Sequence, residues 1–129
     1  MLPAKAPKAP YELQLLQEAS DLAVAAFEEV VKYIRPGMTE KEVIGFAEGY
    51  LRAHGAEDLL ILSRGEYPHA FINRPTFRRI GKDDLFVFSV EIAGVYGYWT
   101  QIIRPIFLSK ESNREAYEVL CQEKEAIQA

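Results

Sequence analysis

The sequence predicts an α+β domain in which an antiparallel sheet carries helices on one of its faces. Two segments with apolar residues at helical spacing come first, a short strand and a strong β-hairpin follow, and another helical segment closes the chain. Strands joined directly in a hairpin pair antiparallel, and this order of elements is typical of α+β proteins. The chain has 129 residues, 49% hydrophobic and 26% charged, which is enough for one domain with a single core.

The composition argues against several classes of protein. The net charge is −4 and the basic residues are scattered, so we expect no nucleic-acid partner. No apolar run reaches the roughly 18–20 residues that span a bilayer, and "MLPAKAPKAP" lacks the apolar core of a secretory signal. The single cysteine, Cys121, cannot form an internal disulfide, which favours a cytoplasmic protein. We expect Cys121 to be half-buried and structural.

The first half of the chain divides into an arm and two helices. Residues 1–10 alternate Pro, Ala and Lys and predict a flexible arm or linker, which leaves residues 11–129 for the domain. Apolar residues at helical spacing predict a long helix over 11–35, and Pro36-Gly37 ends it.

A capping box predicts where the second helix begins. Thr39 can cap it, and Glu42 three residues later completes the box. Gly55 suits the left-handed position after a helix, so His54 is expected to be a helix-end residue rather than a ligand.

The second half is predicted to be mostly extended. A long loop rich in Gly, Pro and Arg separates the first strand from the hairpin, and loops of this length are often functional. The expected segments are a strand at 59–62, the loop at 63–84 with a possible strand at 70–72, hairpin strands at about 85–93 and 96–108 joined by a tight turn at Gly94, and a helix at about 111–128.

Alternation along the hairpin places polar residues where a core is expected. Phe86, Phe88, Val90 and Ile92 share the face that packs on the helices, so Ser89 and Glu91 lie on the opposite face. Gln101 and Arg104 of the second strand lie on opposite faces from each other, and we expect Gln101 to share the face of Ser89 and Glu91. Further residues of that face are apolar, so we expect a second layer or a ligand to cover it. These residues are Leu85, Val87, Trp99 and Ile103.

Two stretches of the chain resemble the pita-bread superfamily of methionine aminopeptidase, Xaa-Pro aminopeptidase, prolidase and creatinase. "IRPGMTEKEV" is similar to the superfamily's "R-x-G-x-T-E-x-E", and "NRPTFRRIGKDDLFVFSVEIAGVYGYWTQIIRPIF" is similar to its strand–hairpin motif. The motifs occur in order at nearly the right spacing, from about Tyr11 to the end of the chain. The resemblance implies the N-terminal half of a pita-bread domain, with an antiparallel sheet and helices packed on one face.

The resemblance also implies a metal site from which this sequence departs. Metallopeptidases of the superfamily bind two divalent metals, with one Asp ligand on each hairpin arm and a His and two Glu from a second half. Counted from Asp84, these Asp positions fall on Ser89 and Gln101. Glu91 could be displaced towards the first site, because the hairpin is one residue longer than usual. We therefore expect no conventional dinuclear metal centre and no cofactor.

One interpretation is a metal-free hydrolase resembling creatinase, acting on a peptide or on a small amide or amidino substrate. The resemblance implies a further His, in the loop before the hairpin, that assists the chemistry. His69 lies a few residues before that position and is then the acid/base candidate. The expected substrate-binding residues are Glu91, Gln101, Tyr98 and Arg104. The last two match a Gly-Tyr pair and an Arg in the superfamily's hairpin motif. Each of three residues also has a purely structural interpretation. His69 would be a loop residue with only local hydrogen bonds, Glu91 a carboxylate paired with an arginine, and Gln101 an amide that bonds a backbone group.

A second interpretation is a non-catalytic pita-bread module that binds a peptide or protein partner. A third, compatible with both, is a fragment of a longer hydrolase. In each case we expect the isolated chain to be inactive, to have no membrane partner, and to pair either with another copy of itself or with a missing second half of the domain.

Overall fold

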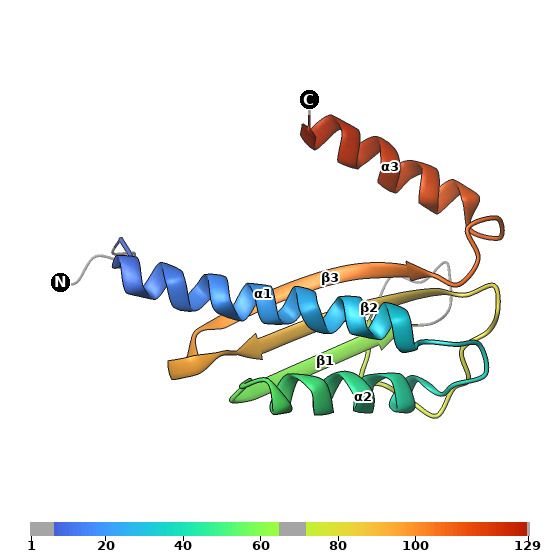
Figure 1. Ribbon diagram of the computed structural model, residues 1–129. Helices are drawn as coiled ribbons and strands as arrows, with labels where there is room; N and C mark the ends of the chain where they lie inside the picture. Colours follow the sequence, from blue (N-terminus) through green and yellow to red (C-terminus); the bar gives the residue numbers. More distant parts are fainter. Residues whose placement is uncertain (1–6, 65–71, 129) are drawn as a thin grey trace.

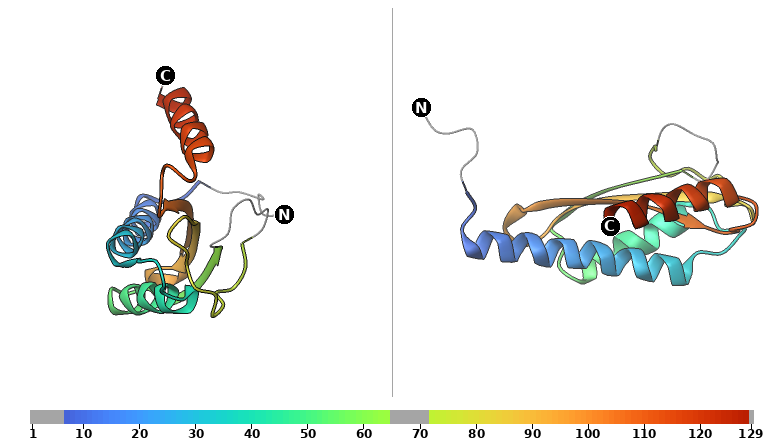
Figure 2. Two further views of the ribbon diagram at one scale, coloured as in Figure 1. Left: turned by 90° about the vertical axis from the view of Figure 1, so that its right-hand side faces the viewer. Right: turned by 90° about the horizontal axis from the view of Figure 1, so that it is seen from above.

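The computed structural model describes residues 7–64 and 72–128, which form a three-stranded antiparallel sheet with two helices on one face (Figures 1 and 2). This confirms the predicted α+β class. The strand order is β1-β2-β3. The elements are α1 (Pro10–Tyr33), α2 (Glu40–Ala53), β1 (Asp58–Arg64), β2 (Leu85–Ala93), the 3-10 turn η1 (Val95–Gly97), β3 (Trp99–Phe107) and α3 (Arg114–Gln128).

Helix α1 begins one residue earlier than predicted, at Pro10. Proline is favoured at the first helical position because its fixed φ suits the helix. Its missing amide hydrogen costs nothing there, since amide hydrogens of the first turn have no partner within the helix. The N–H of Ala9 donates to Glu12 Oε2 at 2.7 Å, which stabilises this end. The helix ends before the predicted Pro-Gly stop, where Gly37 adopts a φ of 93°.

Helix α2 begins at the predicted capping box. Thr39 accepts from the N–H of Glu42, and the Glu42 carboxylate accepts from the N–H of Thr39 at 2.6 Å. The backbone hydrogen bond from Thr39 holds the pKa of Glu42 below its ordinary value. At the other end His54 is a helix-end residue as predicted, with Nδ1 2.8 Å from the Tyr50 carbonyl and its ring stacked on that of Tyr50.

Two strands differ in length from their predictions. Strand β1 extends beyond 59–62, and Ser63 near its end forms a bridge with Asn73. Of the possible strand at 70–72, only Ile72 lies among the described residues, and it is not in a strand. Strand β2 matches its predicted bounds, whereas β3 starts three residues late because the connection from Gly94 includes η1.

The core lies between the sheet and helices α1 and α2. The predicted inward residues of β2 are fully buried there, and Ser20 of α1 bonds Thr100 of β3 at 3.0 Å across the same face. This arrangement leaves the opposite face of the sheet free of α1 and α2 (Figure 2). The buried apolar residues include Ala23, Ala26, Val30, Val43, Ile44, Ala47, Leu51, Phe86, Phe88, Val90 and Ile92.

Helix α3 turns away from the sheet after β3 (Figure 1). It starts three residues later than predicted because Asn113 first closes a turn, in which its side-chain amide donates to the Asp83 carbonyl at 2.7 Å. An edge-to-face contact between Phe107 and Tyr117 joins the strand to the helix. Among the described residues, no helix combines the length and apolar character needed to cross a membrane.

Candidate functional site

Glu91 and Gln101 face each other on the side of the sheet opposite the helices. They are direct partners in the antiparallel register of β2 and β3, so their side chains leave the same face. The Gln101 amide Nε2 donates to Glu91 Oε1 at 3.0 Å. The predicted meeting of these two side chains is therefore confirmed, and Glu91 pairs with this amide instead of with Arg104.

Ser89 lies on the same face, two residues before Glu91. Its side chain is 0% exposed, and its hydroxyl oxygen has no hydrogen-bond partner among the described residues. A buried hydroxyl without a partner costs about 1–3 kcal/mol, so most buried hydroxyls in folded proteins are paired.

Apolar side chains surround the three polar ones. In the register, Leu60 and Leu62 of β1 flank Glu91 and Ser89 on one side, and Ile103 of β3 lies opposite Ser89. Trp99 is 51% exposed and Ile103 is 47% exposed, so the described residues do not provide the second layer expected over this face.

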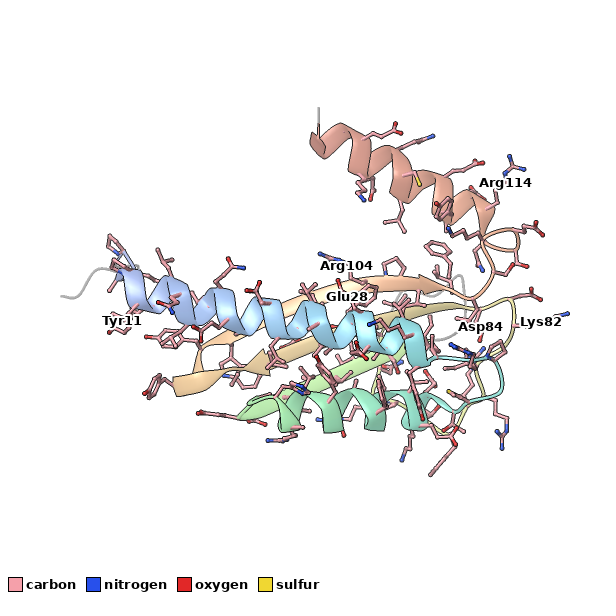
Figure 3. All side chains as sticks on the ribbon, in the orientation of Figure 1. Tyr11, Glu28, Lys82, Asp84, Arg104 and Arg114 are labelled. Carbon is pink, nitrogen blue, oxygen red and sulfur yellow. The ribbon has the colours of Figure 1, made fainter. Side chains whose placement is uncertain are left out.

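Two residues of the expected substrate-binding set lie elsewhere. Tyr98 reaches α1, where its hydroxyl donates to Glu12 Oε1 at 2.9 Å. Arg104 is paired with Phe88 in the register, and its guanidinium donates to the Ile103 carbonyl (Figure 3). The structure brings Ser89, Glu91 and Gln101 together but does not bring these two side chains to them.

The loop before the hairpin is held by isolated β-bridges to the segments around Thr39 and Ser63 and by side-chain hydrogen bonds. Arg78 donates to Asp84 Oδ2 at 2.8 Å, and the N–H of Gly81 donates to the same oxygen at 2.7 Å. His69, the acid/base candidate, lies outside the described residues. Asp84 is the residue from which the family's ligand positions were counted. In the structure it anchors the turn that leads into β2.

Glu40 is a buried carboxylate that the sequence interpretation did not single out. It accepts hydrogen bonds from Thr76 Oγ1 at 2.6 Å and from Ser63 Oγ at 3.3 Å. These bonds join α2, β1 and the loop before the hairpin. The only signal in the sequence was that Glu40 and Thr76 both fall inside the resembling motifs.

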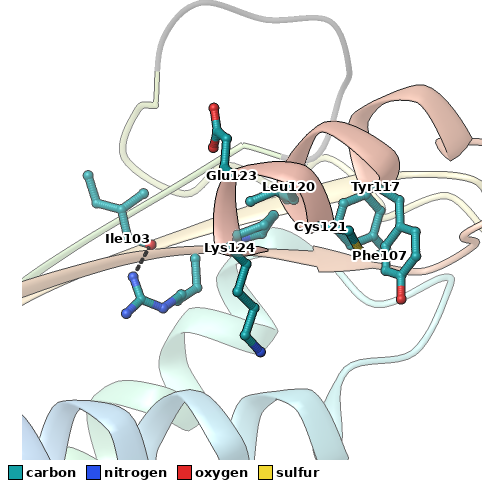
Figure 4. A pocket seen from close by; sticks show the side chains of 9 residues that line it. Ile103, Phe107, Tyr117, Leu120, Cys121, Glu123 and Lys124 are labelled. Carbon is teal, nitrogen blue, oxygen red and sulfur yellow. Dashed lines mark hydrogen bonds between the residues drawn. The ribbon is translucent and has the colours of Figure 1, made fainter. Parts of the chain in front are cut away.

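A hollow of about 720 Å³ lies between β3 and α3 (Figure 4). Ile103 and Phe107 line it from the strand, and Tyr117 and Leu120 line it from the helix. Cys121 also lines this hollow and is exposed, so the expectation of a half-buried structural cysteine is wrong. The reason is that α3 projects from the sheet instead of packing on it.

The donors on the hairpin wall do not fit a pair of divalent metals. They comprise one carboxylate, one amide and one buried hydroxyl, whereas tight binding needs several deprotonated ligands. The Gln101 amide is already bonded to Glu91. Within the described part of the chain, no three His, Cys, Asp or Glu side chains form a group that could hold a metal ion.

Comparisons with known proteins agree on one family. Residues 14–129 match the model of metallopeptidase family M24. The uncharacterized peptidase YqhT of Bacillus subtilis is 28% identical over 122 residues, which are 88% of this chain and 33% of that protein. The chain thus spans about a third of the length of YqhT and of the Xaa-Pro dipeptidase from Pyrococcus furiosus.

Solved structures show the same fold over this part. The prolidase from Pyrococcus furiosus superposes with a TM-score of 0.72 at 27% identity, over 89% of this chain and 35% of that one. Aminopeptidase P from E. coli with the inhibitor Pro-Leu gives a TM-score of 0.77 over 92% of this chain and 28% of that one, and its 22% identity supports the fold alone. The fold is therefore part of a pita-bread fold, and the chain belongs to metallopeptidase family M24.

Proposed function

We propose that this chain forms one wall of the substrate site of a Xaa-Pro peptidase-like or creatinase-like hydrolase without a conventional dinuclear metal centre. The substrate is a peptide or a small amide or amidino compound, and the isolated 129-residue chain does not hydrolyse it. The observation that carries this proposal is the Glu91–Gln101 hydrogen bond on the hairpin wall, where Ser89 and Gln101 stand at the two positions that the resemblance gives to charged metal ligands.

The pair presents acceptors to a ligand. The Gln101 amide nitrogen donates to Glu91 Oε1, so among the described residues both Glu91 Oε2 and Gln101 Oε1 remain available as acceptors on neighbouring strands. Two adjacent acceptors suit a group with two N–H donors, such as an amidinium, a guanidinium or a terminal ammonium. A charged donor adds strength, since hydrogen bonds between ionised groups are about twice as strong as neutral ones.

Acid/base chemistry in this proposal belongs to His69. Histidine titrates near neutral pH and can both accept and donate a proton during amide or amidine hydrolysis. If a longer form of the protein is active, its hydrolysis should survive chelators and should fall much further in His69→Ala than in His54→Ala, because His54 caps α2. Complete loss of activity with a chelator, or equal losses in the two variants, would contradict this assignment.

A non-catalytic binding module is the second candidate. The exposed Trp99 and Ile103 favour it, because exposed apolar side chains on a sheet face are typical of a contact surface. In this alternative a peptide or protein partner binds at the same wall and leaves unchanged. Turnover by a longer form distinguishes the two candidates.

The partner that completes the wall is part of the proposal. We infer that the sheet face with Trp99 and Ile103 is covered either by the second half of a full-length domain or by another copy of this chain, as a homodimer. The single cysteine of the chain supports a cytoplasmic location.

The test is a titration of the 129-residue chain with methylguanidine, followed by NMR at the Gln101 side-chain amide. We expect saturable shifts in the wild type and their loss in Glu91→Gln, because the amide cannot replace the charge of the carboxylate. Glu48→Gln, on the exposed surface of α2, is the matched control and should bind like the wild type. Equal binding by the Glu91→Gln variant would refute the proposed role of the pair.

A further inference from the structure

We propose a second site, independent of the one above, at the end of the molecule where the β2–β3 connection meets the start of α1. Its ligand is an organic cation of the quaternary ammonium class, held against tyrosine rings. A pocket of about 340 Å³ opens there, and Figure 3 labels Tyr11 at this end of α1. The pocket is lined by Tyr11, Leu15, Tyr96 and Tyr98.

Tyr96 occupies a backbone conformation that its side chain disfavours. Its φ is 64°, in the left-handed region where Gly or Asn is usual, and for a bulky residue this conformation is uncommon and strained. The adjacent Gly97, with a φ of 75°, is a suitable residue for such a turn. The Tyr96 ring is 79% exposed, so burial in the core does not offset the strain. A strained, exposed aromatic residue at a pocket is typical of a contact residue.

Tyr98, which lines the pocket, is fixed by a hydrogen bond to a negatively charged residue outside the lining, Glu12. The Tyr98 hydroxyl donates to Glu12 Oε1 at 2.9 Å, and the N–H of Ala9 donates to Glu12 Oε2 at 2.7 Å. These two hydrogen bonds hold the pKa of Glu12 below its ordinary value, so the carboxylate stays ionised. The hydrogen bond to Glu12 also raises the pKa of Tyr98, which keeps the phenol neutral and its ring in place.

These features favour a cation over an anion or a neutral ligand. The face of an aromatic ring carries negative potential and attracts a cation within about 6 Å of its centre. A second carboxylate contacts the backbone of Tyr96, since Glu57 Oε1 accepts a hydrogen bond from the Tyr96 N–H at an N···O distance of 3.4 Å. Lys8 partly offsets the charge of Glu12, so the rings must supply most of the attraction. A quaternary ammonium group suits such a site because it has no N–H groups that require hydrogen-bond partners.

The experiment is an NMR titration of the 129-residue chain with choline. The neutral comparison is its carbon isostere, in which a tert-butyl group replaces the trimethylammonium group. We expect saturable binding of choline, with affinity for the isostere at least about fivefold weaker, since cation–π attraction is absent there. Absence of saturable choline binding, or equal affinity for the two compounds, would overturn the proposal.

Two variants distinguish choline binding in the pocket from non-specific binding to exposed aromatic rings. Tyr96→Asn removes the ring while tolerating the left-handed backbone, and it should weaken choline binding at least about fivefold. Phe77→Ala is the matched control, because Phe77 is 76% exposed but lies in the loop before the hairpin, and it should bind choline like the wild type. An unchanged affinity in Tyr96→Asn, or an equal loss in Phe77→Ala, would refute the assignment.

Discussion

Replacing Ser89 with alanine is expected to stabilise the protein. The hydroxyl is fully buried and has no hydrogen-bond partner among the described residues, so the native state has lost its hydration without compensation. Removing such a group recovers part of a desolvation cost of about 1–3 kcal/mol and leaves only a small void. We expect Ser89→Ala to raise the free energy of unfolding by about 1 kcal/mol, near the lower end of that range.

Ser63→Ala is the matched control. Ser63 is another buried serine of the same sheet, but its hydroxyl donates to the Glu40 carboxylate at 3.3 Å. Removing that donor should lower the free energy of unfolding by about 1 kcal/mol, because the buried carboxylate loses one of the two hydroxyl partners that it has among the described residues.

The assay is urea unfolding of both variants followed by circular dichroism, with the midpoint and slope compared with those of the wild type. Opposite shifts of the two midpoints at equal slopes are the expected result. A Ser89→Ala variant that is destabilised as much as Ser63→Ala would show that the Ser89 hydroxyl has a partner, and the interpretation of this position as an orphaned site residue would be wrong.

Three further predictions concern the hairpin and its surroundings. The double variant Ser89→Asp/Gln101→Asp adds two carboxylates beside Glu91, so calorimetry should show Mn²⁺ affinity at least about tenfold above that of the wild type; no gain would contradict our description of the donors. Tyr98→Phe removes the hydrogen bond from Tyr98 to Glu12. This bond stabilises the protein above pH 4.5, the ordinary pKa of glutamate, and its contribution is lost below that pH as Glu12 becomes protonated. The stability difference from the wild type, measured by urea unfolding across pH, should therefore close in acid, and a difference that persists there would refute the coupling. Trp99→Glu should keep the chain monomeric in a light-scattering dilution series in which the wild type dimerises, and equal dimerisation would exclude this face.

Alternation of side chains was sufficient to predict the hairpin and its two faces. Buried Phe86 and Phe88 fix which side of β2 faces the helices, and a shift of one residue would turn them outward. The same constraint determined that Glu91 and Gln101 lie on one face. This part of the site could be predicted because burial on one side of a sheet specifies the other side as well.

Other features depend on contacts between distant segments, which periodicity does not reveal. Gly94 looked like a tight turn, but the connection continues to Tyr98 because Tyr96 and Gly97 both take left-handed conformations. The burial of Glu40 requires the loop around Thr76 to lie against α2, and no local pattern encodes that contact.

The resemblance to the family carried information of a different kind. Its motif grouped Tyr98 and Arg104 with Gln101, although alternation already separated them by face, and in the structure Tyr98 bonds Glu12 of α1. A motif records residues that occur together in a sequence, and some of them position the backbone while others face the site.

The most direct test of the central claim is calorimetry of the 129-residue chain with Mn²⁺, Co²⁺ and Zn²⁺. The claim is that the Glu91–Gln101 pair of the hairpin wall, beside the buried Ser89, is suited to hydrogen bonds with a ligand and not to two metals. We predict only weak, non-stoichiometric heats for each metal, because one carboxylate provides too few deprotonated ligands. Stoichiometric binding of two metal ions at micromolar affinity would contradict the account.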